Sequence, residues 1–68
     1  MKKLDVEIYR DGVFFFTAVT RAGKRWCKDH IAAEATWLDG GDAFAVETQN
    51  YAMDIAQGMI DDGLRVGP

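Results

Sequence analysis

The sequence has little of what stapled, secreted or membrane-bound domains use. Its 68 residues include one cysteine, Cys27, so no disulfide can form within the chain and a small disulfide scaffold is excluded. Acidic residues at positions 5 and 7 interrupt the apolar segment that a signal peptide needs, and no apolar run reaches membrane-spanning length. We therefore expect one cytoplasmic domain without a membrane contact, near the lower size limit for a single core.

Residue types that commonly carry catalysis are also scarce. There is no serine, and Cys27 forms a C-x-x-H pair with the only histidine, His30. A structural zinc ion needs four ligands, and a nucleophile needs a base that a third group orients. The DGGD stretch at 39–42 lacks the spacing of a phosphate-binding loop and indicates a plain turn. The sequence therefore predicts no catalytic residue, metal site, cofactor or enzymatic activity.

Positive charge is almost missing from the second half of the chain. Residues 1–31 hold seven Lys or Arg against four Asp or Glu, whereas residues 32–68 hold one against seven, for a net charge of -3. This asymmetry favours partners that are steered by charge, or self-association. The acidic half, with Asp54, Asp61 and Asp62, also suggests an inhibitor of a basic partner.

Alternation of apolar and polar residues predicts a hairpin at the N-terminus, turning at Asp11-Gly12. A two-residue turn there sets Ile8 opposite Phe15 and leaves two phenylalanines outside. A three-residue loop over 10–12 instead sets Ile8 opposite Phe14 and Val6 opposite Phe16. We favour this second register because it collects the apolar side chains on one face. That face contains Leu4, Val6, Ile8, Phe14, Phe16 and Ala18.

Two aromatic residues are left on the other face of this hairpin, Tyr9 and Phe15. Exposed rings on a sheet stack nucleic-acid bases in some proteins, but more often a partner or a second copy covers them. Tyr9 and Phe15 are therefore candidate contact residues.

A helix is predicted over 21–33, with Thr20 as its N-cap. Its apolar side contains Ala22, Trp26, Ile31 and Ala33. Gly23 either weakens the helix or lets it approach the sheet closely. Four cations at positions i, i+3, i+4 and i+7 form a basic stripe on the opposite side. The stripe consists of Arg21, Lys24, Arg25 and Lys28.

The remaining residues predict strands at 36–38 and 43–46, joined by the turn at 39–42, and then a second helix. Thr48 or Asn50 caps this helix, and Gly63 ends it with Leu64 placed for a hydrophobic contact. Its predicted buried stripe consists of Ala52, Ile55, Ala56, Met59 and Ile60. Residues 64–66 are expected to add a short edge strand.

This order of elements predicts an α+β fold, ββαβ(β)α, with helices packed on one face of an antiparallel sheet. The function that we expect is non-enzymatic binding of another macromolecule, most simply a protein or a second copy of the chain. Nucleic-acid binding through the basic stripe is the alternative. The candidate contact residues are Tyr9, Phe15, Arg21, Lys24, Arg25 and Lys28.

Overall fold

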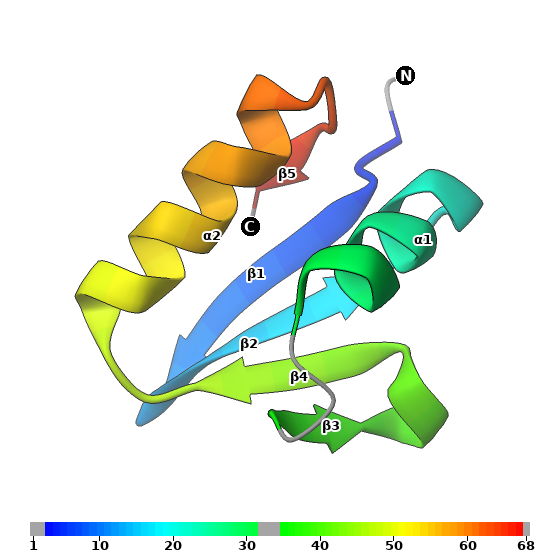
Figure 1. The fold of residues 1–68 in the computed structure, drawn as a ribbon. Helices are drawn as coiled ribbons and strands as arrows, with labels where there is room; N and C mark the ends of the chain where they lie inside the picture. The colour runs from blue at the N-terminus through cyan, green and yellow to red at the C-terminus, as the bar shows by residue number, and fades with distance from the viewer. Residues whose placement is uncertain (1–2, 32–34, 68) are drawn as a thin grey trace.

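The computed structural model describes residues 3–31 and 35–67, which form one mixed sheet and two helices. The elements are β1 (Val6–Asp11), β2 (Val13–Ala18), α1 (Arg21–His30), β3 (Thr36–Leu38), the 3-10 turn η1 (Asp39–Gly41), β4 (Ala43–Val46), α2 (Gln49–Asp61) and β5 (Val66–Gly67). Within the described residues the strand order is β3-β4-β2-β1-β5 (Figure 1). The predicted α+β class and order of elements are confirmed. A short edge strand is present as predicted, but it lies at Val66–Gly67 rather than at 64–66.

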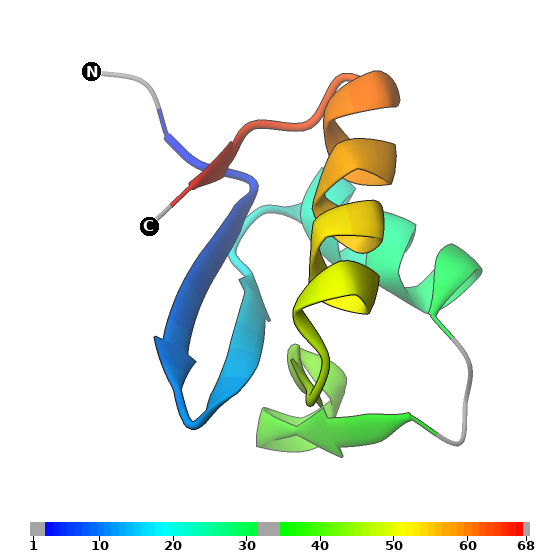
Figure 2. The same ribbon diagram turned by 90° about the vertical axis from the view of Figure 1, so that its left-hand side faces the viewer.

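The sequence predicts an antiparallel sheet, but the sheet is mixed because β5 runs parallel to β1. The chain returns to this edge through the whole of α2, and a crossover of that length permits a parallel strand. Figure 2 shows α1 and α2 on the same side of the sheet, which leaves the opposite side open. We call that open side the outer face.

The hairpin between β1 and β2 has a register that neither prediction gave. Ile8 lies opposite Phe16, and the last pair is Asp11 with Val13. Gly12 stands alone between them with a φ of 77°, which glycine adopts without strain, so the turn is centred one residue later than predicted. The register differs by two residues from the favoured one, and the side chains therefore keep their predicted faces.

The core forms between this sheet and the two helices. Phe16, Phe44, Met59 and Val6 are fully buried, and the rings of Phe16 and Phe44 stack at 4.9 Å. Trp37 contacts the ring of Phe44 edge-on at 5.5 Å. Leu4 was predicted in this core but instead contacts Gly67, because the chain bends at Asp5 before β1 begins.

The helix α1 begins where it was predicted and ends earlier. Thr20 is its N-cap, and its Oγ1 accepts a hydrogen bond from the Gly23 N–H at 3.1 Å. Ile31 ends the helix in an extended conformation, and Ala33 lies outside the described residues. Ala22 is exposed, contrary to prediction. Gly23 and Cys27 face the sheet, and successive helix residues are about 100° apart around the axis, so Ala22 points away from the sheet.

The helix α2 begins at the predicted cap position, Thr48, although no side-chain hydrogen bond forms there. Gly63 adopts a φ of 91° and ends the helix as predicted, while the Leu64 N–H donates to the Met59 carbonyl at 3.0 Å. Ile60 is 52% exposed rather than buried. It follows the fully buried Met59, so the same rotation of about 100° carries it off the core side.

Asp5 joins three segments that are distant in sequence. Its carboxylate accepts hydrogen bonds from Thr20 Oγ1 at 2.6 Å and from the Arg65 N–H at 2.8 Å. Its own N–H donates to the Arg65 carbonyl, and its carbonyl accepts from the Val19 N–H, both at 2.8 Å. The hydrogen bond from Thr20, followed by that from Arg65, lowers the pKa of the Asp5 carboxyl below its ordinary 3.8.

We predict that Gly23→Ala lowers the free energy of unfolding by about 1 to 3 kcal/mol, because the new methyl group would overlap the backbone oxygen of Asp5. Gly58→Ala is the control, since a methyl group there lies 3.4 Å from the Trp26 ring, an ordinary contact. It should raise the stability by up to about 1 kcal/mol through helix propensity. Urea unfolding of both variants measures this, and equal effects would contradict the close approach at Gly23.

We predict that part of the stability is lost as the pH falls through the folded pKa of Asp5. This pKa is lower than in the unfolded chain, so the carboxylate stabilises the fold fully above about pH 3.8 and loses that effect on protonation. Asp5→Asn should unfold more easily at pH 7 and show a flatter pH dependence below 4, whereas Asp54→Asn, at an exposed position, should follow the wild type. Thermal unfolding from pH 2 to 7 tests this, and identical profiles for Asp5→Asn and wild type would contradict it.

Candidate functional site

The six predicted contact residues lie on two separate surfaces. Tyr9 and Phe15 project from the outer face of the sheet, since their strand neighbours Ile8 and Phe16 face the core. The basic stripe lies on α1, which covers the other side of the sheet (Figure 2). The two groups therefore do not form one contact surface.

Tyr9 and Phe15 form a pair on the outer face. They are directly opposite each other in β1 and β2, and their rings stack at 5.0 Å with 19° between the planes. Phe15 is thereby half-buried, whereas Tyr9 remains 58% exposed. Tyr9 is consequently the member of the pair that is available to a partner.

All four cations of the basic stripe are exposed, but two of them are engaged. Lys24 Nζ lies 3.7 Å from Asp42 Oδ2, and Arg25 Nε lies 4.0 Å from Asp29 Oδ2. Exposed pairs of this kind contribute little stability, about 0 to 1 kcal/mol, but they offset charge that a phosphate backbone would use. Within residues 3–31 and 35–67, Arg21 and Lys28 form no ion pair.

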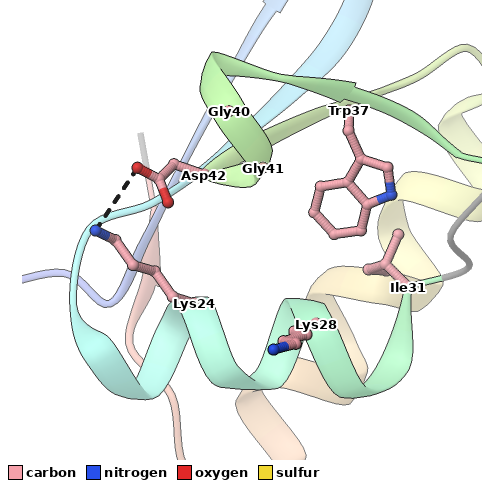
Figure 3. A pocket seen from close by; sticks show the side chains of 7 residues that line it. All are labelled: Lys24, Lys28, Ile31, Trp37, Gly40, Gly41 and Asp42. Atoms are coloured by element: carbon pink, nitrogen blue, oxygen red, sulfur yellow. Dashed lines mark ion pairs between the residues drawn. The ribbon is translucent and has the colours of Figure 1, made fainter.

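A pocket of about 510 Å³ lies between α1 and the turn η1 (Figure 3). The indole of Trp37 and the side chain of Ile31 form its apolar side, and Lys24 and Lys28 extend along α1 beside it. Residues 40–42 close the pocket at the turn. Nothing in the sequence connects Trp37 with the lysines, since only the return of the chain through β3 brings them together.

A second cavity, of about 540 Å³, lies along the part of β1 that extends beyond its pairing with β5. The strand β5 pairs with Val6 and Glu7 only, so within the part of the chain that the structure describes the β1 edge is unpaired from Ile8 to Asp11. The cavity follows this edge and is bounded by α2 on its other side. We call it the edge groove, lined by Ile8, Tyr9, Arg10, Phe14, Ala56, Ile60, Val66 and Gly67.

Two of the most exposed apolar side chains, Tyr9 and Ile60, also line the edge groove. Arg10 is the only charged residue among the described residues that line it, and its guanidinium carbon lies 5.5 Å from the centre of the Phe14 ring. Sequence reasoning missed this groove because it placed Ile60 in the core. The spacing of Met53 and Ile60, seven residues apart and both exposed, is a signal for a second apolar side of α2.

Cys27 and His30, the C-x-x-H pair of the sequence, do not form one site in the structure. Cys27 is buried, and burial raises the pKa of its thiol to about 11, so the thiol is protonated at neutral pH. His30 is exposed and stacks on Trp26 at 4.3 Å. No group of three metal-ligating side chains is present among the described residues.

Trp26, His30 and Asp62 instead connect the C-terminal ends of the two helices. Trp26 Nε1 donates to Asp62 Oδ2 at 2.6 Å, and His30 Nε2 lies 3.8 Å from the same oxygen. The Trp26 ring also packs against Gly58. Asp42 and Asp62, two acids of the second half of the chain, are thus both engaged with groups of α1.

No protein-family model, curated protein or solved structure matches the chain. Among the described residues, no helix has the length and apolar character needed to cross a membrane. The candidate sites are the edge groove and the pocket beside Trp37.

Proposed function

We propose that this protein is a non-enzymatic module that binds another protein, and that it does so through the edge groove. The observation that carries the proposal is the free edge of β1 beside an apolar groove. An unpaired strand edge presents backbone N–H and C=O groups that pair readily with another chain. An adjoining apolar surface adds the burial that makes such pairing stable.

The exposure of Tyr9 and Ile60 supports this location. Tyr9 is 58% exposed and Ile60 is 52% exposed, on the strand side and the helix side of the groove. Burying an apolar side chain of this size contributes about 1.5 to 3 kcal/mol, and large apolar residues around a concave site are typical binding hot spots. A partner that fills the groove would cover Ile60, whereas the Tyr9 ring, which lies on the outer face, would be covered only where the partner extends past the edge of β1.

We predict that Ile60→Glu abolishes binding of a protein partner while the fold is retained. The substitution removes the apolar side chain that the partner would bury and places a charge at the contact that must be desolvated. The affinity should therefore fall at least about tenfold. Tyr51→Glu is the matched control, because Tyr51 is 52% exposed on the same helix but does not line the groove. Both changes are at exposed positions and should alter the stability by about 0.5 kcal/mol or less.

The measurement begins with proteins captured by immobilised wild type, Ile60→Glu and Tyr51→Glu, identified by mass spectrometry. A protein that is retained by wild type and Tyr51→Glu only is purified, and its affinity for all three is measured by calorimetry. Equal affinity of the purified partner for wild type and Ile60→Glu would contradict the edge groove as the contact surface.

The pocket between α1 and η1 supports a second candidate function, the binding of single-stranded nucleic acid. Trp37 provides an indole on which a base could stack, and Lys24 and Lys28 lie beside it as contacts for phosphate (Figure 3). This candidate ranks second because Lys24 is paired with Asp42 and the net charge of the chain is -3.

If this second candidate is correct, Lys28→Glu weakens binding of a labelled oligonucleotide more than Arg25→Glu does. Both residues belong to the basic stripe, but only Lys28 lines the pocket. Loss of one phosphate contact should also lower the salt dependence of the logarithm of affinity by about one unit. Fluorescence anisotropy at low and near-physiological salt measures both effects. The absence of binding even at low salt would exclude nucleic acid.

A further inference from the structure

The shape of the edge groove indicates what kind of segment it accepts. We propose that the groove binds an extended segment of a partner protein as an added strand beside Ile8–Asp11, with an apolar side chain in the groove and an acidic side chain beside Arg10. This inference rests on the proposed function and specifies its partner.

The backbone of β1 provides the pairing surface for such a strand. Beyond Glu7, the β1 edge on the side away from β2 has no strand partner in the described part of the chain. The parallel pairing of Val6 with Val66 and of Glu7 with Gly67 demonstrates that this edge accepts another strand. An added segment would continue the sheet past the end of β5, and its main-chain hydrogen bonds would supply affinity for many sequences.

The side chains beside this edge determine which sequences fit. Successive residues of an added strand point to opposite faces of the sheet, so every second side chain would enter the space between β1 and α2. Ile8 and Phe14 form the sheet side of that space, and Ile60 forms the helix side. A volume of about 540 Å³ accommodates a large aliphatic or aromatic side chain there.

Arg10 gives the groove its charge preference. It is the only charged residue among those that line the groove, it is exposed, and no carboxylate is paired with it among the described residues. A carboxylate near a guanidinium forms charge-assisted hydrogen bonds in a bidentate geometry. Because Arg10 and Ile8 lie on the same face of β1, the partner segment is expected to carry Asp or Glu two residues away from its apolar residue.

A second copy of this chain fits the same edge less well. If two copies pair through antiparallel β1 strands about a two-fold axis, the core-facing sides of both sheets lie on the same side. Directly opposite residues point to the same face, so their residue numbers must differ by an even number. Pairing Tyr9 with Tyr9 of the second copy would place Asp11 of that copy beside Glu7, where Gly67 of β5 already lies, and the next register sets Arg10 opposite Arg10. The first register is blocked by β5, and the second places like charges directly opposite each other, which is destabilising, so a different protein is favoured as the occupant.

The first test is selection from a random peptide library on the whole protein, with removal of peptides that also bind Ile60→Glu. Retained peptides are expected to alternate apolar and other residues and to share an Asp or Glu. Selection on Arg10→Glu should replace that acid with Lys or Arg. The proposal would be overturned if the peptides selected on the wild type and on Arg10→Glu shared the same Asp or Glu, or if no selected peptide depended on Ile60.

The second test separates an added strand from other bound shapes. Methylation of one peptide nitrogen at a time should weaken binding by about tenfold at alternate positions, where an N–H pairs with β1, and by less than about threefold in between. Uniform effects, or effects that repeat every three or four residues as in a helix, would contradict strand addition.

These tests distinguish failure of the inference from failure of the proposed function. A purified partner that needs Ile60 but shows no alternation on methylation would overturn the added strand and leave the edge groove as a protein contact. Library peptides with the expected pattern, together with a purified partner that binds Ile60→Glu normally, would support strand addition at the groove but overturn the groove as the contact for that partner. Sedimentation of the wild type is the last arm, because self-association lost in Ile60→Glu would assign the groove to a second copy.

Discussion

The interaction on which the rest of the structure depends is the set of hydrogen bonds around Asp5. One residue holds the start of α1 through Thr20 and Val19, and the chain leading into β5 through Arg65. A charged acceptor with two good donors at 2.6 and 2.8 Å stabilises a contact more than a neutral one does. In so small a domain the apolar core alone is marginal, and this junction fixes where three segments meet.

The placement of α1 follows from that junction. Because Asp5 lies directly against the first turn of α1, only a glycine fits at position 23, and Val6 contacts the same place from the sheet side. Cys27, one turn further along, is then buried against the sheet. Trp26 donates a hydrogen bond from α1 to Asp62 at the end of α2 and so connects the two helices.

The free edge of β1 is a consequence of the same arrangement. Arg65 is held at Asp5, so β5 begins at the N-terminal end of β1 and pairs with its first two residues only. The C-terminal half of β1 lies beside α2 without a strand neighbour in the described residues, and the edge groove forms there. The anchoring of one end of β1 therefore leaves the other end without a neighbouring strand among the described residues.

Periodicity and caps were sufficient to predict the order of elements, the Thr20 cap and the end of α2 at Gly63, because these depend on local backbone chemistry. They did not predict the hairpin register, which depends on Gly12 alone forming the turn, nor the exposure of Ile60, which depends on how α2 is rotated on the sheet. The pocket beside Trp37 and the edge groove each combine segments far apart in sequence. Of the candidate contact residues, Tyr9 alone lies at the groove, and Arg10 and Ile60 required the fold.

Amide hydrogen exchange of the free protein, followed by NMR, shows directly whether β1 is fixed at Asp5 and open from Ile8 to Asp11. Slow exchange is expected at Asp5, Val6 and Val19, whose N–H groups are hydrogen-bonded in the junction. Fast exchange is expected at those amides of Ile8–Asp11 that point away from β2. Fast exchange at the junction, or protection along the whole edge of β1 at low protein concentration, would contradict this arrangement.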